Sequence, residues 1–180
     1  MKAFSSLLER AQNGARLSDE ECRSLAACDD VDSMMRVAGH LRDQGHGAII
    51  SYSRKVFIPL TKLCRNSCHY CTFARPPRRN EQCYLTRDEV LAIAHAGKKA
   101  GCREALFTLG DKPEDRYSAA RRELAELGHA TTISYAIEMA ELVLKETGLL
   151  PHLNPGVASA AELSAMRRVS VSQGLMLETT

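Results

Sequence analysis

Short apolar stretches alternate with longer amphipathic stretches from residue 56 to the end of the chain. The apolar stretches lie at residues 56–60, 104–109, 152–154 and 174–178, and each has the length of a strand. Between them, apolar side chains recur every three or four positions, which is the period of one helix face. This alternation predicts parallel strands joined by right-handed crossovers, with helices covering the outside of a sheet or barrel.

Local sequence signals predict where the helices begin and end. Capping boxes, in which a serine or threonine is followed three residues later by glutamate, begin at Ser18, Thr86 and Ser159. The first turn of a helix tolerates proline, so a further helix is expected from Pro113 to Gly128. Other expected helix ends carry a glycine that can act as a C-terminal cap: Gly14, Gly45, Gly101 and Gly148.

The first 50 residues predict a helical segment rather than a domain, because they offer few large apolar side chains. Residues 51–180 are expected to form the front part of a βα barrel, an α/β fold with four strand–helix units. Four strands cannot close a barrel, and the last predicted strand has no helix after it. We therefore expect a barrel truncated at its C-terminal end. Because an uncovered strand favours aggregation, the chain alone is expected to be poorly soluble or inactive.

Polar residues follow the predicted strands at the point where each strand ends. A cysteine loop follows the first strand, Gly110 and Asp111 follow the second, Asn154 ends the third, and Glu178 ends the fourth. The carboxyl ends of the strands form the active-site face of a βα barrel. The pattern therefore predicts a functional site at this face.

Composition limits the class of protein and its location. The 180 residues are 44% hydrophobic, and no apolar run approaches the roughly 20 residues of a membrane helix. The first ten residues become charged too early for a signal peptide, which predicts a cytoplasmic protein without membrane contact. The net charge of +2 is too balanced for a typical nucleic-acid binder. One basic cluster, residues 75–79, is interpreted either as a solvated loop or as an anion-facing lid over the site.

Seven cysteines are many for a cytosolic chain of this size, where clustered thiols indicate metal binding or redox catalysis more often than disulfides. Cys64, Cys68 and Cys71 form a C-x3-C-x2-C motif directly after the first predicted strand. The remaining four are scattered and are interpreted as buried or idle thiols: Cys22, Cys28, Cys83 and Cys102.

Three clustered thiolates favour a [4Fe–4S] cluster over zinc. A four-iron cluster normally has four thiolate ligands, so three leave one iron open to another ligand. A structural zinc site needs a fourth protein ligand, and His69 lies between two of the cysteines, where a short loop could hardly let it join. Zinc sites also favour paired C-x2-C units, and the other cysteines form no second pair.

The motif and its surroundings carry a family resemblance. A C-x3-C-x2-C motif after the first strand of a βα barrel resembles the signature of the radical S-adenosylmethionine superfamily. More narrowly, four blocks look like FO synthase: residues 52–61, 105–116, 147–156 and 173–180. The resemblance is closest to the radical half that closes the ring of 7,8-didemethyl-8-hydroxy-5-deazariboflavin, the chromophore of coenzyme F(420).

This resemblance implies two cofactors, a [4Fe–4S] cluster and S-adenosylmethionine. The amino and carboxylate groups of S-adenosylmethionine would chelate the open iron. One electron from the reduced cluster would then cleave the S–C5′ bond to methionine and a 5′-deoxyadenosyl radical, which abstracts hydrogen from unactivated carbon. The cofactor performs this step, while the protein binds, orients and shields it.

The resemblance also assigns residues to the two cofactors. Cys64, Cys68 and Cys71 would ligate the cluster. Tyr70 resembles a residue that packs near adenine, although a tyrosine here could also serve only to pack the loop. These assignments rest on the match between the motif and that of the family.

Three further residues at strand ends resemble cofactor contacts. Gly110 and Asp111 occupy the position that receives the methionine ammonium, where a carboxylate can accept a charge-assisted hydrogen bond. Asp111 could equally be a helix N-cap. Glu178 resembles a ligand of the ribose hydroxyls, and otherwise is an exposed acid. Asn154 and His152 are interpreted as a turn residue and a structural histidine.

The family's reaction implies the partners. It couples a hydroxybenzyl group from tyrosine to a ribitylaminouracil and then loses ammonia as the deazaflavin ring closes. The substrate of this half would be that small-molecule adduct, made by a partner radical S-adenosylmethionine half, and an electron donor is also required. No residue identifies itself as the acid or base for ammonia loss, so the catalytic residues stay unknown.

Three alternatives remain open from the sequence. The chain could belong to another radical S-adenosylmethionine barrel, such as a biotin-synthase-like or menaquinone-pathway enzyme, since the cysteines do not discriminate between these. It could be a zinc-binding interaction module in which Arg75, Arg78 and Arg79 contact nucleic acid. It could also be a nonfunctional gene remnant.

Overall fold

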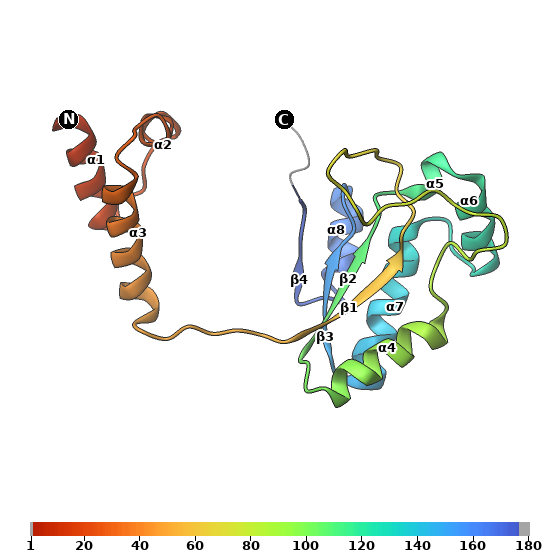
Figure 1. Cartoon of the computed structure of the whole chain (residues 1–180). Helices are drawn as coiled ribbons and strands as arrows, with labels where there is room; N and C mark the ends of the chain where they lie inside the picture. The colour runs from red at the N-terminus through yellow and green to blue at the C-terminus, as the bar shows by residue number, and fades with distance from the viewer. Residues whose placement is uncertain (1, 177–180) are drawn as a thin grey trace. The chain divides into compact units, whose positions relative to one another are not determined.

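The computed structural model describes residues 2–176 and divides into two compact units, Met1–Tyr52 and Ser53–Thr180 (Figure 1). Within the described residues, no helix is both long and apolar enough to cross a bilayer.

The first unit consists of α1 (Lys2–Gln12), α2 (Asp19–Ala26) and α3 (Val31–His46). The helix α1 contacts both others, and α2 and α3 bury none of their side chains completely. The capping box predicted at Ser18 is confirmed. The predicted end of the third helix at Gly45 is wrong. The helix continues to His46, and Gly47 adopts the positive φ of +58° beyond it.

The second unit contains a parallel sheet with the strand order β1-β2-β3-β4 (Figure 1). Its strands are β1 (Lys55–Thr61), β2 (Glu104–Leu109), β3 (Leu150–Asn154) and β4 (Ser172–Gln173). The fourth strand was predicted at residues 174–178, and this is wrong for its described part. Leu175 and Met176 are exposed, so their apolar character does not mark a buried strand. The pairing residues Ser172 and Gln173 lie just before them.

Helices accompany the sheet in the described part of this unit, and the starts of two of them follow predicted capping boxes. The helices are α4 (Arg87–Lys99), α5 (Pro113–Arg116), α6 (Ser118–Glu126), α7 (Thr132–Thr147) and α8 (Ala160–Met166). The capping boxes at Thr86 and Ser159 are confirmed. The single helix predicted from Pro113 to Gly128 is instead two helices, because Tyr117 adopts an extended conformation.

The apolar core lies between the sheet and the helices α4 and α7. These helices contact each other and the strands β1, β2 and β3. Alternate strand residues such as Ile58, Phe107 and Leu153 are fully buried. A Cβ added at Gly97 of α4 would lie 2.4 Å from the Val56 Cβ, so the helix approaches β1 more closely than alanine would allow.

The intervening strand residues point to the other face of the sheet, as the alternation of a strand requires. Phe57, Leu106, His152 and Ser172 lie side by side in register on this face, and none of them is buried. A closed barrel would have this face as its interior.

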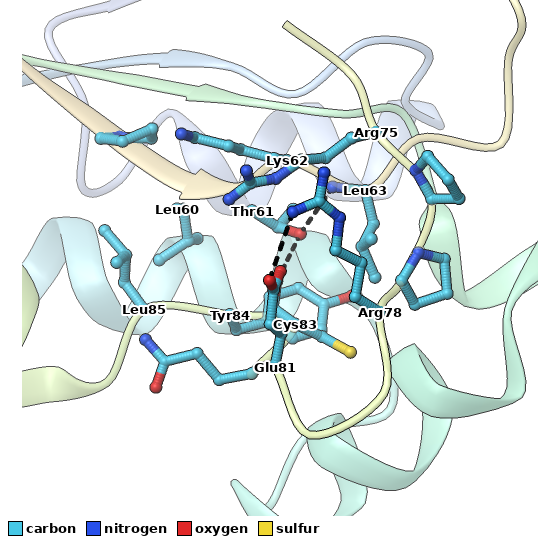
Figure 2. A pocket seen from close by; sticks show the side chains of 14 residues that line it. Leu60, Thr61, Lys62, Leu63, Arg75, Arg78, Glu81, Cys83, Tyr84 and Leu85 are labelled. Carbon is cyan, nitrogen blue, oxygen red and sulfur yellow. Dashed lines mark hydrogen bonds and ion pairs between the residues drawn. The ribbon is translucent and has the colours of Figure 1, made fainter.

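The segment after the cysteine loop folds back onto the end of β1. The Leu85 backbone N–H donates to the Leu60 carbonyl (2.9 Å), and the Thr61 hydroxyl donates to the Cys83 carbonyl (2.7 Å). Figure 2 shows this region, where the buried Tyr84 is among the residues that line a cavity of about 200 Å³. These contacts fix the end of β1, from which the cysteine loop begins.

A buried hydrogen-bond network fixes the short helix α5. The Glu114 carboxylate accepts bonds from the Thr132 backbone N–H (3.0 Å) and the Thr132 hydroxyl (2.5 Å) at the start of α7. The Thr132 hydroxyl also bonds the Tyr84 hydroxyl (2.7 Å), and burial raises the pKa of that phenol. A carboxylate at a helix N-terminus is favoured by the helix dipole. This anchor explains why α5 is separate from α6.

Candidate functional site

The predicted site residues that the structure describes line one cavity at the carboxyl end of the sheet. The cysteine loop follows β1, Gly110 and Asp111 follow β2, and Asn154 ends β3. Parallel strands bring their carboxyl ends to one edge, so these segments meet. The cavity, of about 240 Å³, is lined by the following predicted residues: Cys64, Cys68, Tyr70, Cys71, Gly110 and Asp111. Asn154, interpreted from the sequence as a turn residue, also lines it. Glu178 lies outside the described residues.

Backbone N–H groups donate to the sulfurs of Cys64 and Cys71. The Cys64 Sγ accepts from the N–H groups of Asn66 (3.4 Å) and Asp111 (3.3 Å). The Cys71 Sγ accepts from the N–H of Ala74 (3.4 Å). Such bonds stabilise negative charge on sulfur and are among the features that set the potential of an iron–sulfur cluster. The loop therefore supplies hydrogen-bond donors to the sulfurs of Cys64 and Cys71.

The donor set of the loop matches what a four-iron cluster needs. The thiolate ligands of such a cluster bind different iron atoms, and the three motif cysteines lie on one loop and line one cavity.

The other cysteine described in this region, Cys83, is not available as a ligand. It is buried, and burial together with the nearby Glu123 carboxylate raises the pKa of its thiol to about 11. It therefore stays a neutral thiol near pH 7.

Gly110 is required by the close packing of the cysteine loop against the end of β2. A Cβ at this position would lie 1.8 Å from the Leu63 carbonyl oxygen and 2.7 Å from the Cys64 Cβ. Any side chain would therefore displace the loop that carries the cysteines. The structure explains this glycine by packing, whether or not it also contacts a cofactor.

Asp111 is a buried carboxylate with one free oxygen. Its Oδ2 accepts from Arg65 Nε (2.8 Å) and Asn66 Nδ2 (3.1 Å), whereas its buried Oδ1 has no hydrogen-bond partner among residues 2–176. The helix N-cap interpretation is wrong, because the N-cap of α5 is Lys112 and no side chain caps that helix. A buried carboxylate oxygen without a donor is costly, so a donor from a ligand or a water molecule is expected at Oδ1.

Two arginines join the cysteine loop to α5. Arg65 Nη1 donates to Asp115 (2.8 Å), and the pairing with Asp111 raises the pKa of the Arg65 guanidinium. Arg116 Nη1 donates to the Arg65 carbonyl (3.0 Å) and to the Ser67 hydroxyl (3.0 Å). The loop conformation therefore depends on side chains about 50 positions away in the chain.

Sequence reasoning missed the roles of Arg65, Asn66, Asp115 and Arg116. The first two lie inside the C-x3-C-x2-C motif, and the last two lie in one of the blocks that carry the resemblance. These positions, inside the motif and inside a resemblance block, were the signal that could have pointed to the four residues. Their pairing depends on how the loop and α5 meet in space, which no local pattern specifies.

Tyr70 and the basic segment have different relations to the site. Tyr70 lines the cavity that contains the predicted site residues, and its side chain is largely exposed. This exposure argues against a role in packing the loop. Arg75 borders a second cavity of about 240 Å³ that the three cysteines share. Arg78 lies three residues farther along the chain than Arg75 and pairs with Glu81 at 3.5 Å (Figure 2). Within the basic segment, a lid interpretation therefore suits Arg75 better than Arg78.

His152 has the structural contact expected of it. Its Nδ1 and the Ser172 hydroxyl share a hydrogen bond of 2.6 Å between β3 and β4. Burial, reinforced by the Lys55 ammonium, lowers the pKa of the imidazole from its usual value of 6.5. The folded state therefore resists protonation at this position.

This shift predicts a loss of stability in mild acid. As the pH falls below about 6.5, the unfolded chain takes up a proton at His152 that the folded chain resists, so the free energy of unfolding decreases. His152→Gln is expected to reduce this decrease between pH 7 and pH 5.5, measured by urea unfolding. His95→Gln, at an exposed position on α4, is the matched control. An unchanged pH profile in His152→Gln would contradict the assignment.

Comparisons with known proteins identify the relatives. No family model matches the chain. The FO synthase of Mycobacterium leprae is 48% identical over 194 residues, which cover 99% of this chain. The chain is homologous to part of FO synthase. A second FO synthase, from Nocardia farcinica, is 48% identical over 99% of this chain. The chain spans 22% of each of these two relatives.

A further relative carries a different name. The 7,8-didemethyl-8-hydroxy-5-deazariboflavin synthase of Methanopyrus kandleri is 46% identical over 130 residues, which cover 72% of this chain and 39% of that protein. The FO synthase resemblance seen in the four sequence blocks is therefore confirmed.

Solved structures show the fold. Methylornithine synthase matches 91% of this chain and 44% of its own, with a TM-score of 0.58 and 23% identity. HydG, a maturase of the [FeFe]-hydrogenase, matches 93% of this chain and 35% of its own, with a TM-score of 0.67 and 18% identity. The predicted α/β fold, a partial βα barrel, is confirmed.

Proposed function

We propose that this chain is the cluster-binding part of a radical S-adenosylmethionine enzyme that forms FO, the deazaflavin chromophore of coenzyme F(420). One observation carries the proposal: the three motif cysteines line one cavity with Asp111, whose buried Oδ1 lacks a partner in the described chain. The homology to FO synthase supports the choice of reaction.

Each cofactor has candidate residues. Cys64, Cys68 and Cys71 would hold a [4Fe–4S] cluster, with N–H groups of the loop and of Asp111 supporting their thiolates. The Asp111 Oδ1 would accept a hydrogen bond from the ammonium of S-adenosylmethionine. Tyr70 would lie against the adenine, and Gly110 keeps the loop close to β2. Glu178 is proposed for the ribose hydroxyls on sequence grounds alone.

The bound cofactors would supply the reductive cleavage of S-adenosylmethionine to methionine and a hydrogen-abstracting radical. The residues of this chain bind and orient the cofactors at the carboxyl end of the sheet. The substrate is proposed to be the adduct of a tyrosine-derived hydroxybenzyl group and a ribitylaminouracil. A partner radical half would make this adduct, and an electron donor would reduce the cluster. Residues 51–180 would form the barrel part and residues 1–50 a helical extension.

The alternatives have less support. Homology to FO synthase favours this reaction over a biotin-synthase-like or menaquinone-pathway enzyme. The parallel sheet and the site at its carboxyl end argue against a zinc-binding interaction module. A cytoplasmic location is proposed on sequence grounds, because clustered cysteines in a reducing compartment are more often metal ligands than disulfides.

Anaerobic reconstitution tests the proposal. The chain purified without oxygen is expected to turn brown, to bind iron and sulfide in equal amounts, and to cleave S-adenosylmethionine when reduced by dithionite. A colourless protein that holds zinc would support the interaction module and overturn the proposal. The reaction itself is tested by supplying the adduct and following deazaflavin fluorescence. We expect this product from a full-length relative and not from the 180-residue chain alone.

A further inference from the structure

The carboxylate of Asp111 is held from one side only. Both donors to its Oδ2, Arg65 Nε and Asn66 Nδ2, come from the cysteine loop. Its side chain is only 8% exposed, and its Oδ1 has no donor within the described residues. The loop thus fixes one oxygen and leaves the other for a ligand.

The surroundings of Asp111 keep other side chains away from Oδ1. Gly156, with φ at +81°, lies so close that an added Cβ would be 2.9 Å from the Asp111 Oδ1. Lys112, the next residue, is in the left-handed region at φ 34°, and its ammonium pairs with Glu162 at 3.4 Å. The cation next to Asp111 in the chain is therefore engaged elsewhere.

Arg65 binds two carboxylates at once. Its Nε lies 2.8 Å from Asp111, and its Nη1 lies 2.8 Å from Asp115. A guanidinium can donate in two directions from one rigid plane, which an ammonium on a flexible stem cannot reproduce. Two carboxylates and one guanidinium carry a net charge of −1. The group can therefore still attract a cation even though Asp111 is already paired.

We propose that Arg65 is a positioning residue: it holds the Asp111 Oδ2 so that Oδ1 faces the cavity and receives the ammonium of S-adenosylmethionine. The inference rests on the proposed function. In this proposal Arg65, which lies between two cysteine ligands, orients Asp111, which follows β2. The same loop would then place both the cluster and the group that binds the amino-acid end of the cofactor.

Two variants of Arg65 and one control test this role. Arg65→Gln removes both the positive charge and the planar guanidinium with its two N–H donors. Arg65→Lys keeps the charge and loses the guanidinium. Arg78→Gln removes an exposed arginine that pairs with Glu81 at 3.5 Å and does not contact Asp111 among the described residues. For each variant, iron and sulfide content is measured first. Equilibrium dialysis against the cluster-loaded protein then gives the dissociation constants of S-adenosylmethionine and of 5′-methylthioadenosine, which lacks the amino-acid end.

Arg65→Gln is expected to load the cluster and to bind S-adenosylmethionine about tenfold to a hundredfold more weakly, while 5′-methylthioadenosine changes less than about twofold. Arg65→Lys is expected to lie between this variant and the unaltered chain. In an Asp111→Asn background, Arg65→Gln should add little further weakening, because both changes remove the same interaction. Arg78→Gln should change neither constant.

Other results separate the two proposals. If Arg65→Gln loads the cluster and binds S-adenosylmethionine as tightly as the unaltered chain, Arg65 does not position Asp111, and the proposed function stands. If both Arg65 variants lose the cluster, Arg65 supports the loop instead, and the positioning role is overturned. If the unaltered chain takes up no iron and sulfide, the proposed function fails and the inference fails with it.

Discussion

Cys68→Ala is expected to abolish cluster assembly, reducing iron from about four atoms per chain to less than one. The reason is that the loop supplies only three thiolates, so two remaining ligands cannot retain a cluster that already has one open iron. Reductive cleavage of S-adenosylmethionine should disappear with the cluster. Iron and sulfide analysis with the visible absorption spectrum, all without oxygen, measures the effect. Cys64→Ala and Cys71→Ala should behave in the same way.

Cys22→Ala is the matched control for this loss. Cys22 is an exposed thiol on α2, outside the unit that contains the sheet. Its removal is expected to leave iron content and cofactor cleavage unchanged. Retention of a full cluster in Cys68→Ala would refute the ligand set. An equal loss in Cys22→Ala would show that the iron is bound nonspecifically.

Gly110→Ala is expected to destabilise the second unit by about 3 kcal/mol and to lower cluster loading together with stability. The added Cβ would meet the Leu63 carbonyl oxygen at 1.8 Å, and this oxygen belongs to backbone that cannot rotate away. The segment 63–64 would have to move, which displaces the first cysteine ligand. Urea unfolding and iron content measure the two effects.

Gly39→Ala provides a control of opposite sign. Gly39 lies inside α3, and nothing is within 4 Å of its added Cβ. Alanine at an open helix position is expected to stabilise the helix by about 1 kcal/mol, because glycine loses more backbone entropy on folding. Cluster loading should not change. If Gly110→Ala unfolded at the same urea concentration as the unaltered chain, the close packing of the loop on β2 would be wrong.

The expected losses of stability and of iron loading in Gly110→Ala have the same structural cause. Gly110 allows the cysteine loop to approach β2, and the Asp111 N–H then donates to the Cys64 sulfur at 3.3 Å. A displacement of the loop therefore alters the cysteine ligands and the neighbouring acid together. This is why a change of one carbon at Gly110 is expected to affect iron loading as well as stability.

Most of the fold could be predicted because its signals are local. The capping boxes at Ser18, Thr86 and Ser159 formed as expected, since a cap depends on residues only three positions apart. The second strand matched its apolar run over residues 104–109, because alternate residues there are buried against the helices. Local backbone chemistry and periodic burial require no knowledge of distant segments.

The errors occurred where distant contacts override local preference. The helix predicted from Pro113 divides at Tyr117, and contacts of Glu114 with Thr132 hold α5 as a separate piece. The apolar residues Leu175 and Met176 suggested a strand, but they are exposed, and among the residues up to 176 it is Ser172 and Gln173 that pair with β3. Helical spacing and apolar character describe a segment alone and not what it packs against.

The amino-acid order alone specifies the three thiols, the acid after the second strand and the alternation that brings strand ends to one face. It does so because spacing and periodicity are properties of neighbouring residues. The three-dimensional packing decides the rest: which oxygen of Asp111 is left without a donor, why position 110 admits no side chain, and that Arg65 joins two carboxylates about 50 residues away. Such contacts exist only once the cysteine loop, β2 and α5 lie against one another.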